Sequence, residues 1–313
     1  MADEVSRLQR GGDAECRLFQ KFAEQGHYGG RTYPSNTRQG TYAATPSGIF
    51  LASINANQPV AVADMMRRAL EKWKTLPRDQ RLMADAAPSQ AGNLIRAERF
   101  YPVGGLVLQV HSRDLPREQA SAEQGNRWYG QAWNNDFAWF TKVEARQLLP
   151  PTVATGARHE VPETLVRRIA RLCIVDNVRG QTEPYSDSDV KEARMSAAVQ
   201  KVDGDIASLR LEGQTKTNRE GMWSIAGYRD MERPSQQKRG IETRLLGNAK
   251  FDLKAERFVS FELVALGTRT GATQYNGRQN DSGPAPIGFA FTLAGDKPAE
   301  HVAPAHFWGY GWR

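Results

Sequence analysis

A pattern of period two on either side of Asp203-Gly204 constrains the fold more than any other feature. Residues 195–202 and 206–211 both follow a period of two, and an Asp-Gly pair favours the positive φ angles of a tight antiparallel turn. Further strand-like runs lie at 106–111, 241–251, 257–266 and 287–293. The sequence therefore predicts a mainly antiparallel β domain over residues 86–313.

One or two helices are expected within this β domain. Pro162 stands in the opening turn of a run that ends at Cys173, and apolar residues recur there at helical spacing. A second helix is predicted over 188–194. Trp133, Phe137 and Phe140 also share helical spacing, within an unusually aromatic stretch.

A smaller α/β part is predicted over residues 1–85. Residues 41–45 and 49–54 are β-prone and are joined by Pro46-Ser47-Gly48, which supplies turn chemistry for a hairpin. An amphipathic helix should follow and end at Pro77. Its apolar stripe consists of Val62, Met65, Met66, Ala69, Leu70 and Trp73. Small residues near Asp85 mark the boundary, so the fold class is α+β in two domains.

A hairpin followed by a closing helix resembles the second half of a thioredoxin-like domain, and the resemblance covers about residues 14–76. Cys16 lies near the start of a predicted helix, as a cysteine does in that family. The chain has no second cysteine three residues away and no Trp before Cys16. The resemblance thus implies a degenerate or truncated thioredoxin-like part without the family's dithiol pair.

Charge and cysteine content exclude several classes of protein. Lys and Arg outnumber Asp and Glu by 42 to 35, which favours anionic partners, but the basic residues are scattered and argue against a nucleic-acid binder. Two distant cysteines, Cys16 and Cys173, exclude a disulfide scaffold and a Cys-rich zinc site.

Apolar runs such as 259–266 are too short for a membrane helix. The first residues lack the basic and apolar regions of a secretory signal, which favours the cytoplasm, with export and a removed signal as the alternative.

Cys16 is the first candidate for catalysis. A helix N-terminus and the adjacent Arg17 would stabilise its thiolate, and His27 could act as its partner. The alternative is a small buried side chain without a chemical role. Cys173 lies on the apolar stripe of its helix and is interpreted as a core residue.

A metal site is a second candidate. His301 and His306 are the closest pair of histidines, and either His27 or His111 could complete a site with them. No two histidines have the spacing that places both on one helical face. Such a site would therefore need assembly from distant parts of the chain.

Ligand binding is the third candidate. Trp and Tyr rings beside Asn and Asp groups are typical of sites for polar ligands, although the same aromatics could form a core. A polar loop at Arg179-Gly180-Gln181 could contact an oxyanion or phosphate. The candidate ligand-binding residues are Trp128, Tyr129, Trp133, Asn134, Asp136 and Arg179.

No phosphate-binding loop, dinucleotide fingerprint or hydrolase elbow occurs, and the sequence names no cofactor. The leading hypothesis is a binding or assembly module whose aromatic, Arg-lined surface takes a polar or anionic partner, either a small molecule or another protein. The alternative is an enzyme that uses Cys16 or a histidine-based metal site.

Overall fold

The structure, a computed structural model, describes residues 11–12, 14–27, 40–56, 58–82, 97–117, 132–225 and 233–312. The chain divides into two compact units, residues 1–94 and residues 95–313. The sequence placed this boundary near residue 85.

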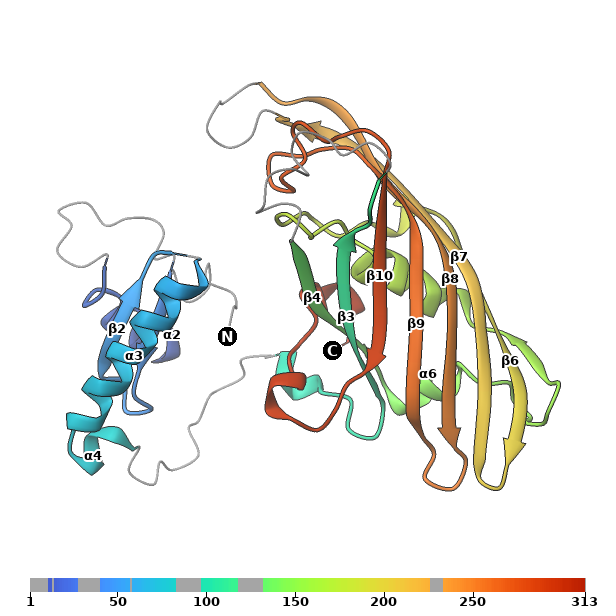
Figure 1. Ribbon diagram of the computed structural model, residues 1–313, viewed down its shortest axis with the longest axis horizontal. Helices are drawn as coiled ribbons and strands as arrows, with labels where there is room; N and C mark the ends of the chain where they lie inside the picture. The colour runs from blue at the N-terminus through green and yellow to red at the C-terminus, as the bar shows by residue number, and fades with distance from the viewer. Residues whose placement is uncertain are drawn as a thin grey trace. The chain divides into compact units, whose positions relative to one another are not determined.

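The N-terminal unit contains a two-stranded antiparallel sheet with helices before and after it (Figure 1). Its elements are α2 (Ala14–Ala23), β1 (Thr41–Ala44), β2 (Phe50–Ile54), α3 (Pro59–Thr75) and α4 (Arg78–Arg81). Pro59 opens α3, where its missing N–H leaves no hydrogen bond unmade. The predicted hairpin and helix are therefore present, and the thioredoxin-like relationship stays a prediction.

The C-terminal unit is built on one eight-stranded sheet in the order β4-β3-β10-β9-β8-β7-β6-β5, in which every neighbouring pair is antiparallel. The strands are β3 (Leu106–Asp114), β4 (Trp133–Phe140), β5 (Arg158–Glu160), β6 (Val190–Asp203), β7 (Ile206–Trp223), β8 (Ser235–Asp252), β9 (Arg257–Thr270) and β10 (Ala285–Leu293). The prediction of a large antiparallel sheet with few helices is confirmed.

Short helices cover one face of this sheet (Figure 1). They are α6 (Lys142–Arg146) and α7 (Glu163–Arg168), and α7 continues as a π-helical turn, η2 (Ile169–Cys173). Short 3-10 turns are η1 (Ala97–Phe100), η3 (Asp187–Asp189), η4 (Pro298–Glu300) and η5 (Phe307–Tyr310). We call the helix-covered face the inner face and the opposite one the outer face.

The main core lies between the inner face and these helices. Alternate residues of the long strands, such as Leu209, Leu245 and Leu263, are buried against Val166 and Ile169 of the helical segment. Their neighbours along each strand point outward, as the pleat of a β-strand requires. The sequence pattern of period two therefore follows directly from a sheet with one covered face.

Glycines allow neighbouring strands to approach closely at two positions. A β-carbon on Gly213 would clash with the backbone oxygen of Arg194, and one on Gly267 would clash with that of Glu242. Glycine at such points lets long strands bend and coil.

The helix predicted over 188–194 is wrong, because these residues enter strand β6 at Val190. A register shift between Val190 and Glu192 brings Val190 and Ala193 to the same buried side, three residues apart. This β-bulge therefore produces the spacing of three residues between buried positions that is typical of a helix.

The helical spacing in the aromatic stretch also misleads, since Trp133–Phe140 form strand β4. Phe137 and Trp139 belong to one apolar cluster and Phe140 to another, because β4 is covered on both faces near its end. The interpretation of these aromatic residues as core residues is confirmed for Phe137 and Phe140, whereas Trp133 is 61% exposed.

Aromatic residues near the C-terminus dock onto the unit, as the sequence predicts. Phe307 is buried and its ring lies 5.7 Å from that of Trp139. The hydroxyl of Tyr310 accepts a hydrogen bond from the backbone N–H of Trp139. Among the described residues, no helix has the length and apolar character needed to cross a bilayer.

Candidate functional site

A hollow of about 550 Å³ lies on the outer face of the sheet. Strands β3, β4, β9 and β10 form it, together with Leu115 just beyond β3. Its lining residues are His111, Ser112, Arg113, Leu115, Trp133, Val264, Leu266, Gly288, Phe289 and Ala290. We call it the outer-face hollow.

The strand register places its side chains in two neighbouring rows across the sheet. One row runs through Trp133, Arg113, Gly288, Leu266 and Arg244 on successive strands. The next row runs through Asn135, His111, Ala290, Val264 and Leu246. Residues of the same pleat face are side by side in such rows, so each row presents its side chains together.

Small residues on β10 create the depression. Gly288 and Ala290 occupy the middle strand, while Trp133 rises on one side and Leu266 and Val264 rise on the other. Large side chains at the two β10 positions would fill this space. The hollow thus follows from the size of the outward residues and needs no special loop.

Apolar side chains around the hollow are unusually open to solvent. Trp133, Leu266, Leu246 and Val264 are 61%, 50%, 45% and 38% exposed. The ring of Trp133 lies 5.6 Å from that of His111. Contiguous exposed apolar surface that is rimmed by polar groups is typical of a binding site.

Two arginines flank this apolar floor without a charge partner. Arg113 and Arg244 are exposed, and neither makes an ion pair or hydrogen bond within the described part of the chain. Three strand spacings separate their strands, or about 14 Å. By contrast, Lys216 on the same face pairs with Glu242 at 2.7 Å. The guanidinium groups of Arg113 and Arg244 are therefore available to an anion.

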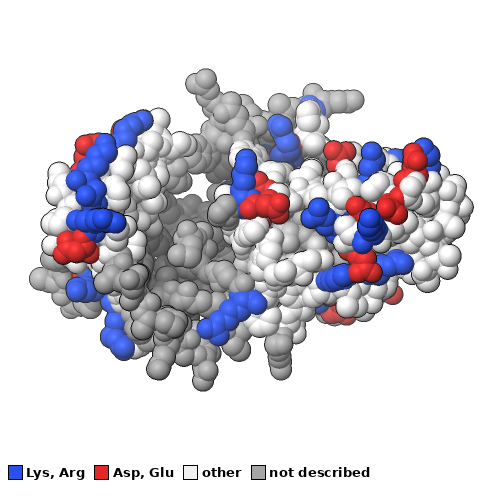
Figure 2. All heavy atoms as spheres, turned by 90° about the horizontal axis from the view of Figure 1, so that it is seen from below, with Lys and Arg blue, Asp and Glu red and all other residues white. Residues whose placement is uncertain are grey.

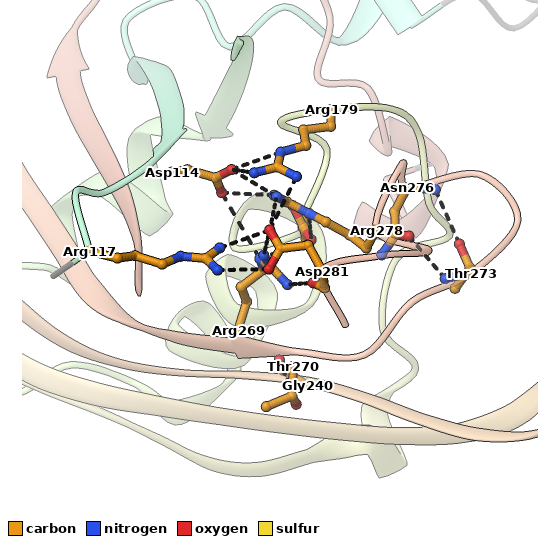
Figure 3. Close-up of polar contacts among 11 residues, drawn as sticks. Asp114, Arg117, Arg179, Gly240, Arg269, Thr270, Thr273, Asn276, Arg278 and Asp281 are labelled. Atoms are coloured by element: carbon orange, nitrogen blue, oxygen red, sulfur yellow. Dashed lines mark hydrogen bonds and ion pairs between the residues drawn. The ribbon is translucent and has the colours of Figure 1, made fainter. Parts of the chain in front are cut away.

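A buried ion network lies at the end of strand β3 (Figure 3). It is formed by Asp114, Arg117, Asp176, Arg179, Arg269, Arg278 and Asp281. The side chains of Arg179, Arg269 and Arg278 have no exposed surface. These seven residues come from four separate stretches of the chain.

Arg278 is the centre of the network. Its two terminal nitrogens donate to both oxygens of Asp114, each at 2.8 Å. The same guanidinium donates to both oxygens of Asp176, at 2.9 and 2.6 Å. Arg179 donates to Asp114 from the other side at 2.9 Å. Bidentate contacts of this kind are the strongest ion pairs that side chains form.

Asp281 anchors the second half of the network. Arg117 donates to its two oxygens at 2.7 and 2.8 Å, and Arg269 donates at 2.6 Å. Arg269 also donates to the backbone oxygen of Asp281 at 2.6 Å. The network therefore ties the β9–β10 connection to the segment that follows β3, where Leu115 lines the hollow.

Charge pairing outweighs burial in this network. Burial alone would raise the pKa of Asp114, but hydrogen bonds and attraction from Arg278 and its neighbours hold that pKa below its ordinary value. Burial would likewise lower the pKa of Arg278, yet Asp176 and Asp114 keep it above the usual range. Each carboxylate of the network accepts hydrogen bonds from arginines, so the network serves structure.

The predicted ligand-binding residues that the structure describes do not lie together at one surface. Trp133 lines the outer-face hollow, and Asn134 follows it on the opposite side of the strand. Arg179 belongs to the buried network and is closed to an oxyanion from solvent. Trp128 and Tyr129 lie outside the described residues.

Asp136 is buried on β4 and binds backbone groups. Its Oδ1 accepts hydrogen bonds from the N–H groups of Phe137 and Ala305, at 2.7 and 2.8 Å. Burial raises the pKa of Asp136 to about 6, although the two hydrogen bonds lower it. Asp136 thus attaches the C-terminal segment to β4.

The candidate catalytic residues lie in the N-terminal unit. Cys16 is fully buried in α2. The Nδ1 atom of His27 lies 2.8 Å from the hydroxyl of Ser53, and its ring stacks on Tyr42. The role of Cys16 and His27 in catalysis stays a prediction. Cys173 is buried in the main core, where burial raises the pKa of its thiol to about 12.

The candidate metal ligands His301 and His306 differ in their surroundings. His301 stacks on Tyr101 with ring centres 4.5 Å apart. His306 is partly buried, and burial lowers the pKa of its ring. Within the described ranges, no group of three His, Cys, Asp or Glu residues is arranged to hold a metal ion.

Sequence reasoning missed most of the outer-face hollow. Arg113 lies in no motif, and Gly288 and Ala290 are ordinary small residues in a strand. One signal was present: residues 263–266 are all apolar, so both faces of the strand are apolar there and Val264 and Leu266 lie on the solvent side. Two-sided apolar character in a strand with one covered face marks an exposed patch.

Comparison with known proteins gives no relative from which to assign this site. No family model, no curated protein and no solved structure matches the chain. The residues of the site itself are therefore the only basis for proposing a function.

Proposed function

We propose that this protein is a binding module whose C-terminal unit takes an anionic partner at the outer-face hollow. One observation carries the proposal: two exposed arginines without partners, Arg113 and Arg244, flank an exposed apolar floor. The buried charges of the same unit have their own partners. An external anion would give these exposed guanidinium groups an ion-pair partner.

The residue types of the hollow support this role. An arginine can contact a carboxylate, sulfonate or phosphate through two parallel hydrogen bonds, and burial of the apolar floor adds a favourable free energy. Trp133 offers a flat apolar surface beside Arg113. Concave, mainly apolar sites with few polar groups are the usual form of ligand sites.

Charge on the rest of the C-terminal unit does not favour a nucleic acid. On the face shown in Figure 2, acidic and basic side chains are interspersed over this unit. Exposed pairs such as Lys238 with Glu220 and Lys201 with Asp203 neutralise each other. A nucleic-acid surface would instead concentrate basic residues on one face.

For the N-terminal unit we propose a thioredoxin-like origin without dithiol chemistry. Support comes from the β1–β2 hairpin and the following helix α3, and from the lack of a second cysteine near Cys16. This proposal is independent of the outer-face hollow.

A matched pair of fluorescent probes tests the proposed function. The sulfonate 8-anilinonaphthalene-1-sulfonate and the neutral N-phenyl-1-naphthylamine share one ring system and differ in the anionic group. We expect the sulfonate to bind about five times more tightly, because Arg113 gains a partner, and Arg113→Gln to remove this preference.

Arg158→Gln is the matched control, since Arg158 is exposed on β5 at the far edge of the same sheet. This control should leave both affinities unchanged. Equal binding of the two probes to the native protein, or equal losses in the two variants, would contradict the proposal.

A further inference from the structure

We infer that the partner is a small amphiphile with one anionic head and a flexible apolar chain, and that Arg113 binds the head. This inference rests on the proposed function and deepens it. It commits to a ligand class, whereas an anionic partner alone could also be a polypeptide or a polyanion.

The floor of the outer-face hollow favours an apolar chain. Gly288 and Ala290 leave a space between Trp133 on one side and Val264 and Leu266 on the other. Its volume of about 550 Å³ falls in the range of small-molecule sites. Chain atoms that lie over β10 would contact apolar walls on both sides and leave water.

Arg113 suits the head group better than Arg244 does. Arg113 lines the hollow, next to Gly288 on β10 and next to Trp133 on β4. Arg244 lies one strand beyond Leu266, outside the lining residues. A single head at Arg113 therefore allows the chain to extend across β10 toward Val264.

The same floor disfavours a polypeptide. The hollow lies on the face of the sheet, where the backbone groups of β3, β9 and β10 are already used in ladders with strands on both sides. A peptide bound there in an extended form would bury its own N–H and C=O groups against side chains that cannot pair with them, which is costly. Peptides that bind sheets do so at free edges. An alkyl chain carries no such groups.

A series of straight-chain carboxylates tests the inference by calorimetry with the full chain. Acetate, butanoate, hexanoate, octanoate and decanoate carry the same head and differ only in apolar length. Each added methylene should tighten binding about fourfold, until the hollow is filled. A flat series would overturn the inference.

Ala290→Leu should fill the hollow and abolish the gain from chain length, lowering octanoate affinity about tenfold or more. Ala198→Leu is the matched control, because Ala198 lies on β6 of the same sheet and outside the lining residues. Leu266→Ala is a second variant, which removes one wall and should weaken octanoate about threefold to tenfold. Unchanged octanoate affinity in both hollow variants would contradict the inference.

The two proposals fail in different ways. If the sulfonate probe keeps its dependence on Arg113 while the carboxylate series is flat, the amphiphile inference is wrong and the proposed function stands. If the sulfonate preference is also absent, both are wrong.

Discussion

Arg113 and Asp114 are neighbours in strand β3, yet the charge of Asp114 is largely buried and paired, whereas that of Arg113 is exposed and unpaired within the part of the chain that the structure describes. The carboxylate of Asp114 points to the buried side and receives hydrogen bonds from Arg179 and Arg278. The guanidinium of Arg113 points to the outer face and has no partner among the described residues. The pleat of one strand thus separates a paired, largely buried charge from an unpaired charge that faces solvent.

This difference shows how to read the many arginines of the chain. Arg179, Arg269 and Arg278 have no exposed surface, and each pairs with a carboxylate of the buried network. A buried ion that lost its partner would cost several kcal/mol, so such pairing is required for folding. An exposed arginine costs little when it is alone, and its availability can serve recognition.

The largest effect should come from removal of the network's centre. Arg278→Met leaves Asp114 and Asp176 buried with fewer partners, and we expect the free energy of unfolding to fall by about 3–5 kcal/mol. Urea denaturation followed by circular dichroism measures this. A decrease in the free energy of unfolding of less than about 1 kcal/mol would show that the buried arginine contributes no more to stability than an exposed one.

Asp136 differs from the carboxylates of the buried network, because backbone N–H groups hold it and, among the described residues, no arginine ion pair does. Its folded pKa of about 6 exceeds the ordinary value near 4. The folded state therefore binds the extra proton, and stability from this group is present below about pH 4 and lost as pH rises to about 6.

Asp136→Asn should keep an acceptor oxygen for Ala305 and remove this pH dependence. Relative to the native protein, the variant should gain up to about 3 kcal/mol of stability at pH 7.5 and nothing at pH 4. Urea denaturation at both pH values compares them. A variant that is equally destabilised at both pH values would show that ionisation of Asp136 does not destabilise the folded state.

The smallest effect on stability should come from the outer face. Arg113→Gln removes an exposed charge without a partner, so we expect a change within about 0.5 kcal/mol in the free energy of unfolding. The same urea titration measures this. A clearly destabilised variant would place Arg113 with the structural arginines and remove the basis of the comparison.

The sequence predicted regular elements well where local chemistry determines them. The tight β6–β7 turn is present one residue later than predicted: Asp203 ends β6 and pairs with Ile206, and Gly204 begins the two-residue turn at φ 56°. The helix predicted from Pro162 to Cys173 is present as α7 and η2. The prediction failed at Val190, where a bulge places two buried residues three apart. A bulge is set by pairing with β7, which local sequence does not reveal.

The site was less predictable than the fold. Trp133 was a candidate because of its residue type. The position of Arg113 in the hollow, by contrast, depends on which strands pair with β3. Arg179 was expected to meet a ligand because its loop is polar. Its actual partners, Asp114 and Asp281, lie 65 and 102 residues away in the chain, a pairing that no local pattern carries.

A double-mutant cycle between Arg113 and the ligand's charge tests the central claim most directly. Octanoate and octanol share one chain length and differ in the anionic head, and each is titrated by calorimetry against the native protein and Arg113→Gln. We expect a coupling free energy of about 1 kcal/mol between the guanidinium and the carboxylate. A coupling of zero would mean that Arg113 does not recognise an anion at the outer-face hollow.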